Sequence, residues 1–298
     1  MIEKIPIPIC GVILALLSLG NLLSDVHPYL RALCAAIGII LIILVISKLV
    51  LYPGKIKEDF KNPVIASSSG TFSMSLMLLS TYLSSFMPNI GYGVWILGAA
   101  LHILLMIWFT YRFIIRNFDI STVYPTYWIV FVGITMASIT AHAHGLDEIA
   151  FIFFSVGFAA MIITFPLIAY RYLKYSDIPD ANKPLICIFT AVLSILIVGY
   201  INSYNNLSIE FLEVMYLFAC IFYIFSLAKF IEYRNLEFYP SFAAFTFPFV
   251  ISGLATKGVL SKIGSNILLN GVLNIETVIA CAIVIYVLIK YMKFLSRN

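Results

Sequence analysis

A dense run of hydroxyl side chains is the part of this sequence best suited to coordinate an ion. The run contains Ser67, Ser68, Ser69, Thr71, Ser73 and Ser75. Inside a membrane, hydroxyls can replace part of an ion's hydration shell without adding a fixed charge. They can equally donate to carbonyl groups one turn earlier in their own helix and serve structure alone. Other apolar segments carry further hydroxyls, at Thr135, Ser138, Thr190, Ser194 and Thr246, and this recurrence favours a lining role.

A second group has the residue types of a metal site. His142 and His144 are separated by one residue and are followed by Asp147 and Glu148. Histidines and a carboxylate can bind zinc, and a membrane metalloenzyme is the function that such a site would indicate. All four residues lie in one short loop, however, and no ligand from another segment is evident. We therefore interpret the group as a solvated loop and predict no metal, no cofactor and no catalytic residue.

The third feature is a proline set among phenylalanines, in the string from Phe242 to Phe249 (Phe-Ala-Ala-Phe-Thr-Phe-Pro-Phe). Pro248 cannot donate to the carbonyl of Ala244, so a helix through this string is expected to kink. On a helix that faces the interior, the kink can place the ring of Phe247 across a path. A phenylalanine that only packs against its neighbours is the simpler alternative.

Composition decides which elements must position these side chains. Of the 298 residues, 62% are hydrophobic and 11% are charged, and the mean hydropathy is +1.04. A soluble domain has about 45–50% apolar and about 25% charged residues. These values exclude a soluble enzyme, a nucleic-acid-binding protein and a disordered chain. The five cysteines lie singly in apolar runs, without the spacing of a redox pair or a zinc site.

Apolar runs of about 20 residues, long enough to cross a bilayer, occur ten times. The predicted spans cover residues 5–24, 29–52, 64–86, 92–115, 126–142, 149–170, 184–204, 209–231, 239–257 and 272–294. Because the breaks between them are short, we predict an all-α integral membrane protein with a single transmembrane domain over residues 1–298. The first apolar run lacks an Ala-x-Ala cleavage site and follows Glu3, so we interpret it as a retained span.

Basic residues predict the orientation. The N-terminus, the even-numbered loops and the C-terminus, with the adjoining helix ends, hold 15 of them, whereas the other side holds Arg31, Lys257 and Lys262. Positively charged loops remain cytoplasmic, so both termini are predicted to be cytoplasmic, as an even number of spans requires. The net charge of +4 therefore indicates topology and not a nucleic-acid partner.

The odd-numbered spans recur about every 58 residues, and each begins near a proline: Pro6, Pro63, Pro125, Pro184 and Pro240. This period predicts five helical hairpins of one orientation, related by an axis along the membrane normal and able to close in a quasi-fivefold ring around a central pore. Glycine, serine and threonine total 29 in the odd spans and 10 in the even spans. Small residues permit close packing, so the odd helices are predicted inside. A solid bundle without a pore is the alternative.

The span centres are uncharged. No Asp, Glu, Lys or Arg lies near the middle of any predicted span. Ion-coupled pumps commonly place an ionisable group there, whereas weak uncharged sites let an anion both enter and leave. The pattern favours an anion channel or facilitative carrier. Glu210, Glu213 and Glu276, near helix ends, leave a proton-coupled carrier as the alternative.

With these features together, the chain resembles the tellurite-resistance/dicarboxylate transporter family, which includes plant slow anion channels. The architecture covers nearly the whole chain, and the most specific motif is the string Ala244-Phe245-Thr246-Phe247-Pro248. Further similarities are Cys10-Gly11 in the first span, Asn62-Pro63-Val64 at the start of the third, and Pro125 with Tyr127 at the start of the fifth.

This resemblance implies a pore of odd-numbered helices, in a homotrimer within the cell (inner) membrane, that moves small inorganic anions or C4-dicarboxylates such as malate. By motif position it places the pore gate at Phe247. Two positions differ from the family pattern: Cys10 stands where an aromatic residue is usual, and no proline accompanies Thr190. The predicted pore lining is Gly11, Ser69, Ser73, Thr135, Ser138, Thr190, Ser194, Thr246 and Pro248.

Overall fold

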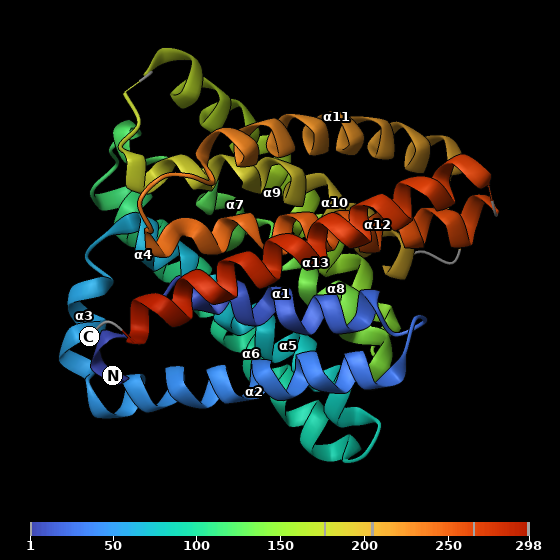
Figure 1. The fold of residues 1–298 in the computed structure, drawn as a ribbon, viewed down its shortest axis with the longest axis horizontal. Helices are drawn as coiled ribbons and strands as arrows, with labels where there is room; N and C mark the ends of the chain where they lie inside the picture. The colour runs from blue at the N-terminus through green and yellow to red at the C-terminus, as the bar shows by residue number, and fades with distance from the viewer. Residues whose placement is uncertain (1, 176, 204–205, 265, 297–298) are drawn as a thin grey trace.

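The computed structural model describes residues 2–175, 177–203, 206–264 and 266–296, and this part of the chain is helical without any β-strand. The long helices run roughly parallel to one another, and both termini lie at the same end of the molecule (Figure 1). This end also holds the short helix α3 (Pro53–Asp59). The all-α fold class is therefore confirmed.

The even-numbered predicted spans form long helices. They are α2 (Pro28–Leu51), α6 (Pro88–Phe109) with its π-helical continuation η2 (Thr110–Arg116), α9 (Asp147–Lys174), α11 (Ile209–Tyr233) and α13 (Ile267–Ser296). Pro28 and Pro88 occupy the first turns of their helices, where a missing N–H group costs nothing.

The odd-numbered predicted spans are shorter or broken. They are α1 (Ile9–Leu22); α4 (Pro63–Ser68) with α5 (Gly70–Ser84); α7 (Thr126–Phe131) with α8 (Thr135–Ala141); the 3-10 helix η5 (Asp180–Cys187) with α10 (Ile188–Ser203); and the 3-10 helix η6 (Pro240–Phe245) with α12 (Phe247–Ile263). Three further 3-10 turns are η1 (Ile2–Lys4), η3 (Ile120–Thr122) and η4 (His142–His144).

The described residues include eight helical segments that are long and apolar enough to cross a membrane. The other two predicted spans, 5–24 and 126–142, correspond to the 14-residue α1 and to the pair α7 and α8. Eight candidate spans are thus present by length and composition, and the count of ten stays a prediction.

Burial separates the two sets of helices. In the segments Pro63–Ser84, Asp180–Ser203 and Pro240–Ile263, 72–89% of the most apolar stretch is buried, whereas the value is 22–33% for the five even-numbered helices. Nearly every residue of α1 is buried as well. The prediction that the odd helices lie inside and the even helices outside is confirmed.

The contacts between the inner helices form a closed cycle. Helix α1 packs on α5, α5 on α8, α8 on α10, α10 on α12, and α12 on α1. Each inner helix also packs on the outer helix that follows it in the chain, as α5 does on α6. Glycine permits the closest of these approaches: a Cβ atom at Gly98 of α6 would lie 2.9 Å from the backbone nitrogen of Met77.

Candidate functional site

A cavity of about 60 Å³ lies among the inner helices. All five odd-numbered segments contribute to its wall, and most of the lining side chains are apolar. Representative lining residues are Gly11 of α1, Thr71 of α5, Trp128 of α7, Ala191 of α10 and Pro248 of α12. We call this space the central cavity. Among the described residues that line it, none is Asp, Glu, Lys or Arg.

The helix that carries Pro248 is interrupted beside this cavity. The 3-10 helix η6 ends at Phe245, Thr246 has φ −91° and ψ −77°, and α12 begins at Phe247. The start of α12, with the positive end of its helix dipole, therefore lies beside the central cavity, which Phe247 and Pro248 line.

Four phenylalanines surround this break, and they point to different neighbours. Phe242 and Phe245 contact each other, and Phe245 also contacts Phe230 of α11. Phe249 contacts Phe230 as well. Phe247 is the member of the group that lines the central cavity, with 7% of its surface exposed. In the part of the chain that the structure describes, no ring contact holds the Phe247 side chain.

Some residues in the wall of the central cavity carry polar atoms without partners. Thr126, Trp128 and Ser241 line it, and within the described residues Thr126 Oγ1, Trp128 Nε1 and Ser241 Oγ form no hydrogen bond. Buried polar groups are normally paired, so unpaired ones mark strain, ordered water or a ligand. Three residues of the cavity wall thus carry a hydrogen-bond donor that has no partner within the described chain.

The hydroxyls predicted to line the pore occupy several places. Gly11 and Pro248 line the central cavity. Ser69 and Ser73 instead line a lateral cavity between α2 and α6. The Ser69 hydroxyl donates to the Ala66 carbonyl at 2.6 Å, and Ser73 pairs with His102 Nδ1 at 2.8 Å.

The remaining predicted hydroxyls are buried between helices. The hydroxyls of Thr190 and Ser194 lie 3.1 and 3.0 Å from the Ser252 hydroxyl, and these contacts join α10 to α12.

The other three hydroxyls have separate contacts. The Thr246 hydroxyl donates to the Ala243 carbonyl at 2.7 Å. Ser138 donates to the Gly199 carbonyl at 3.4 Å. Thr135 packs against Gly157 and Gly199 and is described further below. The structure thus groups Phe247, Gly11 and Pro248 together and distributes the hydroxyls around them.

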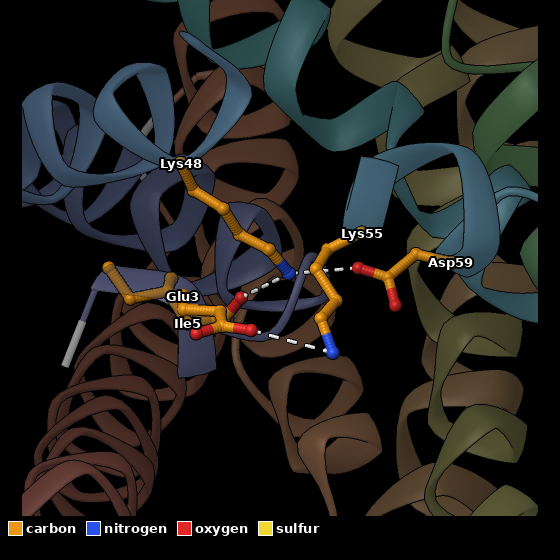
Figure 2. Close-up of polar contacts among 5 residues, drawn as sticks. All are labelled: Glu3, Ile5, Lys48, Lys55 and Asp59. Carbon is orange, nitrogen blue, oxygen red and sulfur yellow. Dashed lines mark hydrogen bonds and ion pairs between the residues drawn. The ribbon is translucent and has the colours of Figure 1, made fainter. Parts of the chain in front are cut away.

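A wider space of about 370 Å³ opens at the end of the molecule that holds both termini. It shares Pro8 and Ser241 with the central cavity, so the two are adjacent. We call it the vestibule. Figure 2 shows its charged wall, in which the Lys48 ammonium of α2 donates to the Ile5 carbonyl and to Asp59 Oδ2, both at 2.8 Å.

A second ion pair of the vestibule joins Lys55 Nζ to Glu3 Oε1 at 3.4 Å (Figure 2). The Lys48 side chain is 5% exposed, whereas Lys55 and Glu3 are largely exposed. The buried pair at Lys48 fixes α2, α3 and the N-terminal segment relative to one another, and the exposed pair contributes little to stability.

Glu276 is a buried carboxyl group outside the central cavity. It is the tenth residue of α13, about 14 Å along the helix from Ile267, and 4% of its surface is exposed. The Thr256 hydroxyl donates to Glu276 Oε2 at 2.5 Å, and Tyr216 lies 3.0 Å from the same hydroxyl. Within the described residues no cationic side chain lies within 4.0 Å of this carboxyl group.

The predicted loop from His142 to Glu148 is instead the 3-10 helix η4 followed by the first turn of α9, and its two histidines have different partners. His142 Nδ1 lies 2.7 Å from Asp147 Oδ1, and His144 Nε2 lies 2.8 Å from the Ser80 hydroxyl of α5. Partial burial lowers the pKa of His144. No group of three His, Cys, Asp or Glu side chains with metal-binding geometry occurs within residues 2–175, 177–203, 206–264 and 266–296.

Membrane-length apolar helices, arranged as a buried inner set and an exposed outer set, define a multi-pass membrane protein. The chain belongs to the SLAC1 family of voltage-dependent anion channels, whose sequence profile matches residues 5–292. It is also similar to an uncharacterized transporter of Methanocaldococcus jannaschii, with 25% identity over 76% of this chain and 74% of the relative. The family predicted from the motif in the ninth span is confirmed.

Several residues of this site were not identified from the sequence. Trp128, Thr126 and Ser241 are ordinary in composition, and only the folded structure shows that their polar atoms lack partners. Glu276 was predicted near the start of a span that begins at residue 272, because Asn270 and Gly271 interrupt the apolar run. The helix in fact begins at Ile267, so the carboxyl group lies deeper than its sequence position indicates.

Proposed function

We propose that this protein moves small anions across a membrane through a path between the inner helices of five hairpins in a quasi-fivefold ring. The closed cycle of contacts α1–α5–α8–α10–α12 supports this arrangement. The inner helices would form the wall and the outer helices would face lipid. By family likeness we further propose a homotrimer in the cell membrane.

The observation that carries the proposal is the character of the central cavity. It is lined by all five odd-numbered segments, its wall includes Thr126, Trp128 and Ser241, which carry unpaired donors, and its described lining has no charged side chain. Hydrogen-bond donors stabilise an anion, and the absence of a fixed positive charge lets it leave again. The vestibule beside it supplies lysines near the entrance.

Phe247 is the proposed gate of this path. Its ring lines a cavity of only about 60 Å³, so the cavity is too narrow for a continuous hydrated passage. The ring makes no aromatic contact within the described residues and borders the cavity, which offers space for a rotation of the side chain. The broken backbone at Thr246 and Pro248 adds local freedom at the same place.

Replacement of Phe247 by alanine tests this gate. We expect Phe247→Ala to raise nitrate and chloride flux in proteoliposomes by about tenfold, which corresponds to a barrier lowered by about 1.4 kcal/mol. The matched control is Phe249→Leu, because Phe249 is fully buried and contacts α11 instead of the central cavity. Unchanged flux in a correctly inserted Phe247→Ala protein would exclude Phe247 as the gate.

The choice of anion follows from the size of the cavity. A volume of about 60 Å³ suits a small inorganic anion, whereas a C4-dicarboxylate such as malate requires the ring of Phe247 to move aside. We therefore expect wild-type flux to be faster for nitrate and chloride than for malate, and Phe247→Ala to reduce this difference. A selectivity series in proteoliposomes measures both.

A proton-coupled carrier is the second candidate, and Glu276 is the observation that favours it. A lone carboxylate buried without a cation carries a large desolvation cost, so the uncharged acid suits this site better. The titratable neighbours are Tyr216, Cys220 and Tyr223 of α11, and the nearby Lys257 of α12 pairs with Asp25 instead, at 2.8 Å. Such a group can bind and release a proton during transport.

The two candidates differ in whether a proton accompanies the anion. A coupled carrier would acidify the liposome lumen during malate uptake, and Glu276→Gln would abolish this acidification while anion uptake continued. Glu213→Gln, an exposed position on α11, is the matched control and would leave the proton signal unchanged. Malate uptake by the wild-type protein without any change in internal pH would exclude the proton-coupled carrier and support the channel.

A further inference from the structure

The lateral cavity between α2 and α6 is separate from the anion path. Its volume is about 760 Å³, and most of its wall is hydrocarbon, including Val45 and Leu49 of α2 and Leu101 and Leu104 of α6. Engineered apolar cavities of about 150 Å³ bind benzene, so this space has room for a much longer hydrocarbon chain. Its position between two outer helices opens it toward the membrane.

One end of the lateral cavity is basic. Lys57 of α3, Lys61 just after α3 and Arg112 of η2 all line it. Lys61 pairs with Glu58 at 2.6 Å. Among the described residues, neither Lys57 nor Arg112 has a carboxylate within 4.0 Å. The cavity thus combines an apolar slot with a concentration of positive charge at its mouth.

The basic end lies where lipid headgroups would be. Helix α3 is at the end of the molecule that holds both termini (Figure 1), which the distribution of basic residues places in the cytoplasm. Trp108, 37% exposed on α6, lines the cavity near Arg112 and contacts Phe60 at 5.6 Å between ring centroids. Tryptophan is enriched at the level of lipid headgroups, so the apolar part extends from there into the hydrocarbon region.

From this complementarity we propose that the lateral cavity binds an anionic phospholipid of the cytoplasmic leaflet. Lys57, Lys61 and Arg112 bind its phosphate-bearing headgroup, and an acyl chain fills the slot between α2 and α6. Basic pockets between transmembrane helices on this side recognise anionic headgroups by the same chemistry. The positive charge at the mouth favours a lipid over a second copy of this chain, whose own basic cytoplasmic edge would be repelled.

The lipid would also contact the outer surface of the path. Cys10, Ser69 and Ser73 form the floor of the lateral cavity. Their sequence neighbours Gly11, Ser68 and Thr71 line the central cavity. An acyl chain in the slot therefore supports the wall that separates the two spaces, at the break between α4 and α5.

Native mass spectrometry of the full-length protein tests the headgroup site. Purified wild-type protein is mixed with phosphatidylglycerol or with phosphatidylethanolamine of the same acyl chains. We expect phosphatidylglycerol to bind at least about tenfold more tightly, and the triple variant Lys57→Gln/Lys61→Gln/Arg112→Gln to lose this preference. The matched control Lys174→Gln/Lys290→Gln/Lys293→Gln removes three charges from the same side of the membrane, away from the lateral cavity, and should keep the preference.

A second pair of variants tests the slot. Leu104→Trp fills the lateral cavity and should reduce binding of both lipids, whereas Ile107→Trp should not, because Ile107 is equally exposed on α6 (63% against 61%) but outside the lining. Three results would each overturn the proposal: equal binding of the two lipids by wild type, equal loss in both triple variants, or a disulfide between Leu104→Cys residues of two copies. None of these readouts depends on anion flux, so the proposal stands or fails apart from the transport function.

Discussion

At the scale of single residues, the wall of the central cavity includes side chains whose hydrogen-bond donors have no partner. Thr126 is fully buried, yet its hydroxyl forms no hydrogen bond within the described chain. A buried unpaired hydroxyl costs about 1–3 kcal/mol, and under the proposed function an anion in the path would supply the missing partner. Thr140 provides the contrast: its hydroxyl donates to the Met136 carbonyl at 2.7 Å and accepts from Trp95 Nε1 at 2.8 Å.

These two threonines should therefore respond oppositely to loss of the hydroxyl. We expect Thr126→Val to lower nitrate flux by about 3- to 10-fold, equivalent to one hydrogen bond of about 1 kcal/mol, with an unchanged or higher Tm. Thr140→Val should lower the Tm, because it leaves the indole N–H of Trp95 unpaired, while flux stays near wild type. Flux measurements in proteoliposomes and thermal unfolding in detergent give the two readouts, and a Tm loss in Thr126→Val would contradict the assignment.

At the scale of elements, the inner helices are fixed by contacts that leave no room for an added methyl group. Thr135 begins α8 and lies between two glycines of other helices. A Cβ atom at Gly199 of α10 would lie 2.3 Å from Thr135 Cγ2, and one at Gly157 of α9 would lie 2.1 Å from Thr135 Oγ1. Thr135 thus acts as a spacer where α8, α9 and α10 meet, whatever further role it has in the path.

Substitutions at these positions test the packing. Gly199→Ala should lower the free energy of unfolding by about 1–3 kcal/mol, because the core must shift to accept the methyl group. Adding Thr135→Ser, which removes Cγ2, should restore most of the loss. Gly93→Ala on α6 is the control, since nothing lies within 4 Å of its added Cβ, and it should be neutral or stabilising by up to about 1 kcal/mol. Thermal unfolding in detergent measures these stabilities. If the double variant is no more stable than Gly199→Ala alone, the steric explanation is ruled out.

At the scale of the whole molecule, the charges predict the orientation and the apolar surfaces separate the inner helices from the outer helices. Both termini and α3 lie at one end (Figure 1), and the vestibule with Lys48 and Lys55 opens at this end. The same end carries the excess of basic residues by sequence. The proposed path would then have its lysine-lined entrance in the cytoplasm and its His142–Glu148 loop on the opposite side.

Reporter fusions test this orientation. A fluorescent protein fused after the last helix should fold and fluoresce, because the C-terminus is predicted to be cytoplasmic. A cysteine introduced at Asp147, in a background without the five native cysteines, should react with a membrane-impermeant maleimide added from outside. The opposite labelling pattern would reverse the direction of the whole path.

The sequence by itself determined the class of protein, most of its helices, the division into inner and outer sets, and the family. These properties follow from local composition, because lipid accepts only apolar, internally hydrogen-bonded segments and close packing selects small residues. It did not determine which side chains line the cavity. Ser69 and Ser73 face a lateral space and Ser68 faces the central one, because successive helical residues point about 100° apart and only neighbouring helices decide which direction is the axis. The burial of Glu276 and the unpaired donor of Trp128 likewise arise from contacts between segments far apart in the chain, and tertiary structure alone creates them.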